Sequence, residues 1–142
     1  GPLEGELTQL AKQLGIAANV RFLGQVPDVR RYFKAFDLFV LSSDHEPFGM
    51  VLLEAMAAEV PIFATNCGGA PEVVDVPERL FELGNAEQLA TKLTAYFSSQ
   101  NPEGRQRLIT HANERLHRLF SDDTARQRFF ALAMVRGALR QP

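Results

Sequence analysis

The chain has a single cysteine and no long apolar run. Among its 142 residues only Cys67 is a cysteine, so an internal disulfide framework is excluded and a reducing compartment is expected. No apolar stretch approaches the length of a membrane-spanning helix, and no signal peptide opens the sequence. These absences predict a cytoplasmic protein.

Several common functional motifs are also missing. The sequence has no Gly-x4-Gly-Lys phosphate loop, and its aromatic and basic residues do not interleave as in a nucleic-acid platform. The adjacent residues Asp44-His45-Glu46 rarely converge on one ion, and His111, Glu114 and His117 are spaced three apart rather than as metal-protease histidines. We therefore expect no metal site, no bound cofactor and no nucleic-acid partner.

The composition is that of one globular domain. Hydrophobic residues make up 46% and charged residues 23% of the chain. The net charge of −2 hides an asymmetry: residues 1–100 carry 7 Lys and Arg against 13 Asp and Glu, whereas residues 101–142 carry 8 Arg against 4 acids. Two interpretations remain open for the basic part, contact with an anionic surface such as the inner membrane or solvated helix faces.

One stretch, residues 42–57, organises the rest of the sequence. The apolar run Leu38–Leu41 is typical of a buried parallel strand, Pro47 and Gly49 break the chain, and Met50–Ala58 favours a helix. A strand, a glycine turn and a helix N-terminus form an anion site, because the first helical N–H groups lack internal partners. Glu46 and Glu54 bracket this site with carboxylates that suit sugar hydroxyls. Phosphate on amides and hydroxyls on acids together indicate a nucleotide sugar.

The remaining patterns alternate between helix and strand. Before the central stretch we expect helix 3–14, strand Val20–Leu23, a helix capped by Asp28 that runs to Ala35, and the strand Leu38–Leu41. After it we expect strand Pro61–Thr65, a short helix Pro71–Val74 and a small strand Leu80–Phe81. Three amphipathic helices follow, after Asn85, after Pro102 and after Ser121. This order predicts an α/β fold with a parallel Rossmann-like sheet followed by three C-terminal helices. Ligands of such sheets lie beyond the carboxyl ends of the strands.

Four motifs in order resemble those of retaining glycosyltransferases with the GT-B fold, family 4. They are the Glu-x7-Glu pattern from Glu46 to Glu54, Val20-Arg21-Phe22-Leu23-Gly24, Pro61-Ile62-Phe63-Ala64-Thr65, and the Gly-Gly-x-Pro-Glu turn that begins at Gly68. The resemblance covers most of residues 1–75 and, more loosely, the helices that follow.

The resemblance implies a role for each matching residue. The acid at Glu46, the catalytic candidate, would bind hydroxyls of the donor sugar rather than attack it, and Glu54 would bind the ribose. The segment Phe48-Gly49-Met50-Val51 would meet phosphates and sugar through its amides, Val26 would meet the base, and Gly68 and Gly69 would let the backbone approach the ligand. Taken singly, each of these residues is also typical of an ordinary turn or helix surface without a functional role.

The resemblance also implies missing parts. Residues 1–142 would form a partial nucleotide-sugar-binding domain, the C-terminal GT-B domain, whose part 85–142 is helical. Its first β-α-β and the whole acceptor domain would be absent, together with the family's diphosphate-binding Arg and Lys. Two absent strands would normally lie between Val20–Leu23 and Leu38–Leu41, so both strands would have unpaired edges. We expect that the chain either rearranges its sheet or forms homo-oligomers through these edges. Glu59 replaces a glycine that usually ends the central helix, so that turn is expected to differ.

The resulting hypothesis is a fragment of a hexosyltransferase that is inactive alone. The parent would transfer a hexose with retention from a nucleotide-sugar donor to a saccharide or lipid-linked acceptor, as in lipopolysaccharide or capsular polysaccharide synthesis. It would be cytoplasmic, with contact to the inner-membrane surface left open. The alternatives are a non-catalytic nucleotide-sugar-binding or assembly module and a GT-B nucleotide-sugar epimerase.

Overall fold

The computed structural model describes residues 1–99 and 101–131. The chain divides into two compact units, Gly1–Arg31 and Tyr32–Pro142. Within the part of the chain that is described, no helix combines the length and apolar character needed to cross a bilayer.

The N-terminal unit contains helix α1 (Glu4–Gln13) and a 3₁₀ helix (Ala17–Asn19). As predicted, α1 stops at Gly15, whose φ of +70° allows its N–H to bond Lys12 O and that of Ile16 to bond Ala11 O. The leucines of the predicted apolar face are between 48% and 62% exposed: Leu3, Leu7, Leu10 and Leu14. Periodicity therefore predicted the helix, whereas Ala11 is its one buried residue.

Two predictions for residues 20–35 are wrong. Val20–Leu23 is not a strand, because a strand exists only when its backbone pairs with a neighbour, and these residues have no such neighbour in the described chain. The expected helix is limited to α2 (Arg30–Phe33). Asp28 has a φ of +50°, and its carboxylate accepts from Arg30 Nε at 3.2 Å and Arg31 Nε at 2.8 Å instead of capping backbone amides.

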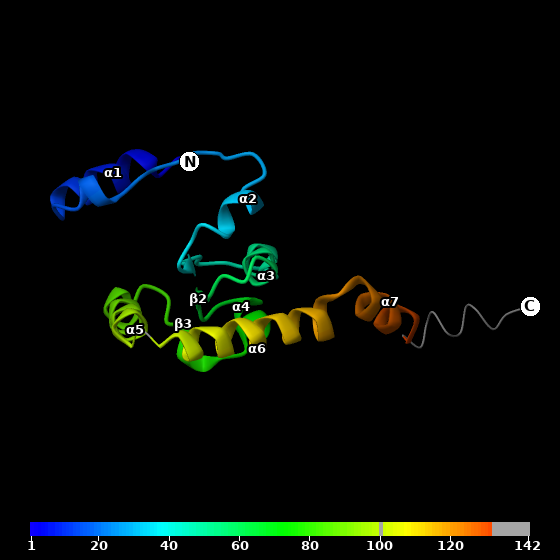
Figure 1. Ribbon diagram of the computed structural model, residues 1–142. Coiled ribbons are helices and arrows are strands. Elements are labelled where there is room, and N and C mark those ends of the chain that lie inside the picture. The colour runs from blue at the N-terminus through cyan, green and yellow to red at the C-terminus, as the bar shows by residue number, and fades with distance from the viewer. Residues whose placement is uncertain (100, 132–142) are drawn as a thin grey trace, which may run out of the picture. The chain divides into compact units, whose positions relative to one another are not determined.

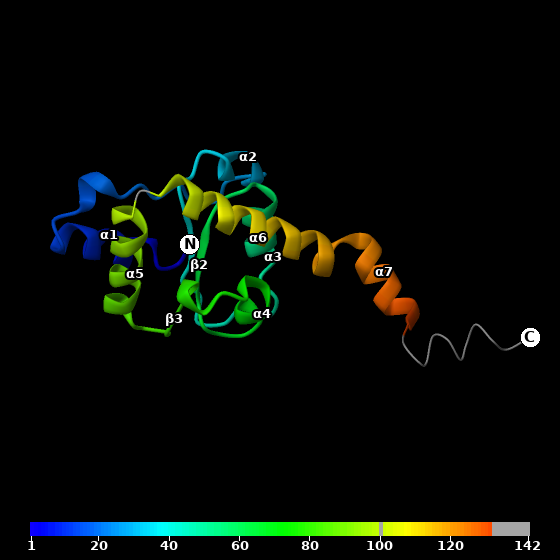
Figure 2. The same ribbon diagram turned by 60° about the horizontal axis from the view of Figure 1, so that its bottom comes forward.

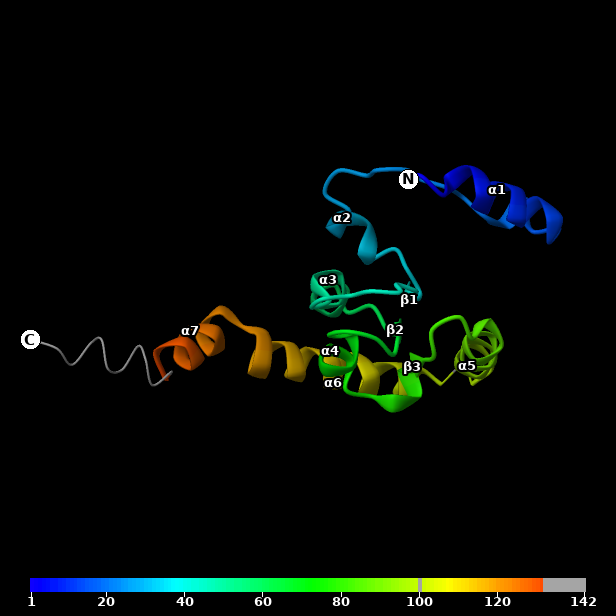
Figure 3. The ribbon, with the colours of Figure 1, turned by 180° about the vertical axis from the view of Figure 1, so that it is seen from behind.

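The second unit is built on the predicted parallel sheet. Its strands are β1 (Phe39–Leu41), β2 (Ile62–Thr65) and β3 (Leu80–Phe81), in the order β1-β2-β3 (Figures 1 and 3). Phe39 is in register with Ile62, and Ala64 with Leu80. Helix α3 (Met50–Ala57) connects β1 to β2, while α4 (Ala70–Val74) and a 3₁₀ helix (Pro77–Arg79) connect β2 to β3. The carboxyl ends of all three strands therefore meet at one edge.

Three helices follow the sheet, each close to its predicted position. Helix α5 (Ala86–Ser98) is capped by the Asn85 side chain, and α6 (Pro102–Phe120) by that of Asn101. Helix α7 (Asp122–Ala131) begins where the Ser121 hydroxyl accepts from the Thr124 amide at 3.3 Å. The apolar strip predicted for this last helix extends to Leu132, Ala133 and Met134, which lie outside the described residues.

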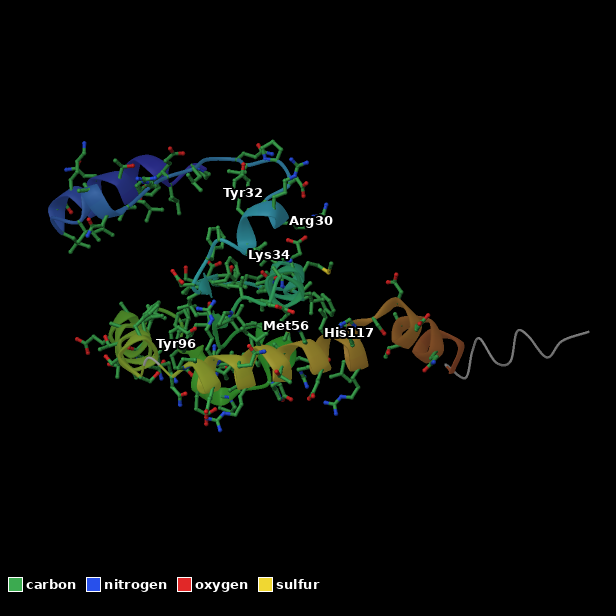
Figure 4. The ribbon with its side chains drawn as sticks, viewed as in Figure 1. Arg30, Tyr32, Lys34, Met56, Tyr96 and His117 are labelled. Carbon is green, nitrogen blue, oxygen red and sulfur yellow. The ribbon has the colours of Figure 1, made fainter. Side chains whose placement is uncertain are left out.

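The core lies where α3 meets the sheet and α6. Leu52, Ala55 and Met56 recur at i, i+3 and i+4 on α3 and are each at most 1% exposed. They pack with buried residues of the other elements: Phe33, Val60, Ile62, Ala64, Ala70, Val73 and Val74. Met56 of α3 lies on the side that faces α6 (Figure 4), and Figure 2 shows α6 crossing α3. The length of the central helix and the positions of β1 and β2 agree with prediction to within one residue at each end.

The end of α3 keeps a left-handed turn despite the missing glycine. Glu59 adopts a φ of +63°. Its N–H bonds Met56 O at 2.9 Å, and the N–H of the buried Val60 bonds Ala55 O at 3.0 Å. This pair of bonds is a Schellman cap, so the expectation of a different turn is wrong.

Candidate functional site

Two loops form the candidate site at the carboxyl edge of the sheet. Residues 42–49 follow β1, and residues 66–69 follow β2. The Thr65 hydroxyl, at the end of β2, lies 2.7 Å from Ser43 O and 3.0 Å from Leu41 O, while the Gly69 amide donates to Glu46 O at 2.8 Å. Thr65 is 2% exposed, so its hydrogen bonds are buried. Together with the bond from the Gly69 amide they hold the two loops against each other.

The two glycines of the second loop are required by close packing. A Cβ on Gly68, which has a φ of +52°, would lie 2.0 Å from Glu46 O, and one on Gly69 would lie 2.8 Å from Phe48 Cα. No side chain fits at either position without moving the backbone of the first loop. These glycines thus allow the two loops to contact each other. An approach of Gly68 and Gly69 to a ligand stays a prediction.

Gly49 and Glu46 shape the start of α3. Gly49 is buried with a φ of +89°, and its N–H donates to Glu46 Oε1 at 2.8 Å. One of the amides predicted to meet a phosphate is therefore already satisfied by the catalytic candidate. The next two amides, of Met50 and Val51, have no protein acceptor among the described residues. These N–H groups remain directed out of the helix N-terminus, as an anion site needs.

Glu54 lies on the same helix, about 6 Å along the axis from Met50 at a rise of about 1.5 Å per residue. It is half-buried, and its carboxylate makes no hydrogen bond or ion pair with any side chain that the structure describes. Residues 46–54 thus combine three kinds of group. One oxygen of the Glu46 carboxylate accepts a hydrogen bond, the amides of Met50 and Val51 have no acceptor, and the Glu54 carboxylate has no partner among the described side chains. Val26 is half-buried in the N-terminal unit, and its contact with a base stays a prediction.

Arg115 contributes to the site although its sequence pattern did not indicate it. Its side chain is 8% exposed. Nε donates to Val73 O at 3.1 Å, Nη1 to Asp75 Oδ2 at 2.6 Å, and Nη2 to Glu72 O. It therefore holds the end of α4, the helix that begins directly after Gly69. The solvated-face interpretation of the C-terminal arginines is wrong for this one, and no local signal distinguished it from its neighbours.

A second unforeseen contact involves aromatic rings. Phe48, near the end of the first loop, meets Phe120 at the end of α6 with ring centroids 6.0 Å apart and planes at 79°. This is the edge-to-face arrangement that aromatic pairs favour.

Other candidate chemical groups lie apart from this edge. Arg79 precedes β3, at the amino end of the sheet, where its guanidinium lies over the rings of Phe63 and Tyr96 and donates to Ile62 O. Burial lowers the pKa of Arg79, and Tyr96 offsets part of that effect. Cys67 is half-buried with its thiol directed at Ser43 O, and His111, Glu114 and His117 are exposed. Within the described residues, no three His, Cys, Asp or Glu side chains gather as metal ligands.

Comparison with known proteins places this chain in a family. The model of "Glycosyl transferases group 1" matches residues 1–115. The lipopolysaccharide core biosynthesis glycosyltransferase LpsE of Rhizobium meliloti is 31% identical over 134 residues, which are 93% of this chain and 39% of LpsE. The chain thus spans less than half the length of this relative.

Solved structures agree with the fold. Sucrose-phosphate synthase from Thermosynechococcus elongatus has a TM-score of 0.81 and 27% identity over 97% of this chain and 35% of its own. HepE of Anabaena, solved with UDP and glucose, has a TM-score of 0.79 and 28% identity over 94% of this chain and 36% of its own. The predicted α/β fold is confirmed and matches GT-B glycosyltransferase structures. The chain belongs to the group 1 glycosyl transferases.

Proposed function

We propose that this chain is the donor-binding part of a retaining hexosyltransferase of family 4. The observation that carries the proposal is the N-terminus of α3, where the unpartnered amides of Met50 and Val51 stand between the carboxylates of Glu46 and Glu54. Amides and a helix dipole suit a diphosphate, and carboxylates suit sugar and ribose hydroxyls. HepE, which resembles this chain, was solved with UDP-glucose.

The residues have distinct roles in this proposal. Glu46 uses Oε1 to hold the Gly49 amide, which leaves Oε2 for hydroxyls of the donor hexose. Glu54 binds the ribose, and the amides of Phe48, Met50 and Val51 approach the phosphates and sugar. Stabilisation of the leaving diphosphate by these amides would lower the barrier to transfer. No carboxylate here acts as a nucleophile, and neither a metal nor a cofactor takes part.

The test is titration of UDP, GDP and ADP, and of UDP-glucose and GDP-mannose, followed by ligand-observed NMR. We expect saturable binding of one nucleotide and its sugar, weakened at least fivefold by Glu54→Ala. Glu114→Ala, which removes an exposed helix acid from α6, is the matched control and leaves binding unchanged. Absence of binding to every nucleotide contradicts the proposal for this chain.

The partners of the parent follow the same reasoning. We propose a saccharide or lipid-linked acceptor, as in lipopolysaccharide core synthesis, and a cytoplasmic location with contact to the inner-membrane surface through the arginine-rich part. Retention is checked by the anomeric configuration of the product of the full-length parent. Binding of the chain to anionic rather than neutral vesicles checks the surface contact, and equal binding to both would contradict it.

Self-association through β1 is the remaining part of the proposal. Phe39 N–H donates to Pro61 O of the neighbouring chain segment, so the amide of the next residue, Val40, is directed away from β2. Among the described residues β1 pairs with β2 alone, and its other edge is open to a second copy. Light scattering is expected to give a mass above that of a monomer, reduced to a monomer by Val40→Pro. A monodisperse monomer of the unaltered chain would contradict it.

A further inference from the structure

Helix α6 contacts both loops of the candidate site, directly or through α4. At Arg115 it binds two carbonyls and one carboxylate at the end of α4. At Phe120, five residues later, it meets the ring of Phe48. Figure 4 shows this part of α6, with His117 labelled, beside α3.

Phe120 is held firmly enough to serve as a fixed wall. Ala112, Leu116 and Phe120 recur at intervals of four on one face of α6, and all three pack against the core cluster. Arg115, buried on the same helix, prevents α6 from sliding relative to α4 because its planar guanidinium binds three acceptors in fixed directions. The position of the Phe120 ring therefore follows from the core.

Phe48 is clamped between this wall and the second loop. Its backbone lies against Gly69, where even a Cβ would come within 2.8 Å of Phe48 Cα. Its ring meets Phe120 edge to face, although the residue is 45% exposed. In the chain Phe48 lies between Gly49, whose amide donates a hydrogen bond, and Glu46, whose carboxylate accepts it. A change in the backbone dihedral angles of Phe48 therefore turns the peptide groups that lead to the open amides of Met50 and Val51.

We propose that Phe120 is a positioning residue of the donor site, which acts through Phe48 to fix the orientation of the amides at residues 48–51. It does not touch the ligand. The inference rests on the proposed function, because the orientation matters for catalysis only if those amides bind the donor. Its chemical requirement is an aromatic ring at the end of α6, rather than mere apolar volume.

The first experiment compares Phe120→Leu with Phe120→Tyr. Leucine keeps packing against the core but lacks an aromatic ring, whereas tyrosine retains the ring. Phe97→Leu, on α5, is the control because Phe97 also meets another aromatic ring and is 52% exposed. Amide chemical shifts of residues 48–51 are expected to move in Phe120→Leu and to stay near their original values in Phe120→Tyr and Phe97→Leu. Unmoved shifts in Phe120→Leu overturn the proposal, and this result needs no ligand.

The second experiment is a double-mutant cycle on nucleotide binding. Phe120→Leu is expected to weaken binding of the nucleotide selected by the wild-type chain about fivefold, because the amides of residues 48–51 lose their fixed orientation. In a Phe48→Leu background the same substitution should have no further effect. An equal loss in both backgrounds overturns the proposal. If the wild-type chain binds no nucleotide, the proposed function fails, while the amide shifts still decide the positioning role.

Discussion

Helix α3 has a left-handed residue at each end, and the two ends differ in how much room they leave. At the N-terminus, Gly49 is buried, and a Cβ there would lie 2.9 Å from Leu52 Cδ1. The neighbouring Gly68 and Gly69 are closed to side chains by the backbone of residues 46–48. At the C-terminus, Glu59 has a positive φ of the kind that favours glycine, yet its side chain is exposed and has room.

The difference shows which end of α3 is constrained by close packing. The Glu59 carboxylate reaches α6, where Asn113 Nδ2 donates to its Oε1 at 3.4 Å, so the side chain gains a contact that partly offsets the backbone cost. At the N-terminus a side chain on Gly49 would meet the side chain of Leu52, and one on Gly68 or Gly69 would meet backbone atoms of the first loop. The end of α3 that bears the candidate site is thus specified by close approach, whereas the other end is specified only by a dihedral angle.

The largest effect is expected from Gly68→Ala. The added Cβ would meet Glu46 O at 2.0 Å, so the two loops must separate, at a cost of about 2–3 kcal/mol of unfolding free energy. Nucleotide binding should be lost as well. Gly84→Ala is the matched control, because Gly84 also has a positive φ, of +76°, but open space around its Cβ. Urea unfolding measures both, and equal losses would show that the dihedral rather than close approach matters.

A smaller effect is expected at the carboxylate that caps the site. Glu46→Ala leaves the buried Gly49 amide without its acceptor and should cost about 1–2 kcal/mol. Glu46→Gln keeps a carbonyl oxygen in reach of that amide and should retain most of the stability, while it still weakens binding of the nucleotide sugar. Unfolding and titration of the two variants separate the capping role from the ligand role. Full retention of sugar-nucleotide affinity in Glu46→Gln would contradict a ligand role for the charge.

The smallest effect is expected at the other end of α3. Glu59→Gly relieves the left-handed backbone cost but frees the unfolded chain, so stability should rise by only about 0.5 kcal/mol. Glu59→Ala keeps the dihedral cost and removes the contact with Asn113, so it should be slightly less stable than the unaltered chain. Thermal unfolding ranks the stability of the two variants and the unaltered chain, and nucleotide binding should be the same in all three. A loss of binding in either variant would mean that this end also serves the site.

Local sequence signals predicted most of the sheet and its helices. The apolar runs at residues 38–41 and 61–65 form β1 and β2, because a parallel strand covered on both faces needs an uninterrupted apolar segment. The last three helices begin where they were expected, after Asn85, near Pro102 and after Ser121. Asn85, Asn101 and Ser121 cap them, since a cap depends on a side chain and amides two or three residues away. Glu46 and Glu54 were also found at the carboxyl edge, where chain order alone places them.

Features that depend on distant partners were missed. The expected strand Val20–Leu23 fails because pairing, not composition, makes a strand. Arg115 looked like its exposed neighbours in sequence, yet its acceptors lie some forty residues earlier, at the end of α4. The contact between Phe48 and Phe120 likewise joins residues far apart along the chain.

The sequence by itself determined the fold class, the family and the pair of acids at the carboxyl edge, because these follow from periodicity, short-range spacing and motifs read along the chain. Only the tertiary structure decided that Glu46 caps Gly49, that Gly68 and Gly69 press against the first loop, and that α6 supports both loops. The physical reason is that a local signal needs only a few neighbouring residues, whereas close packing and hydrogen bonds across the fold exist only once distant segments have met.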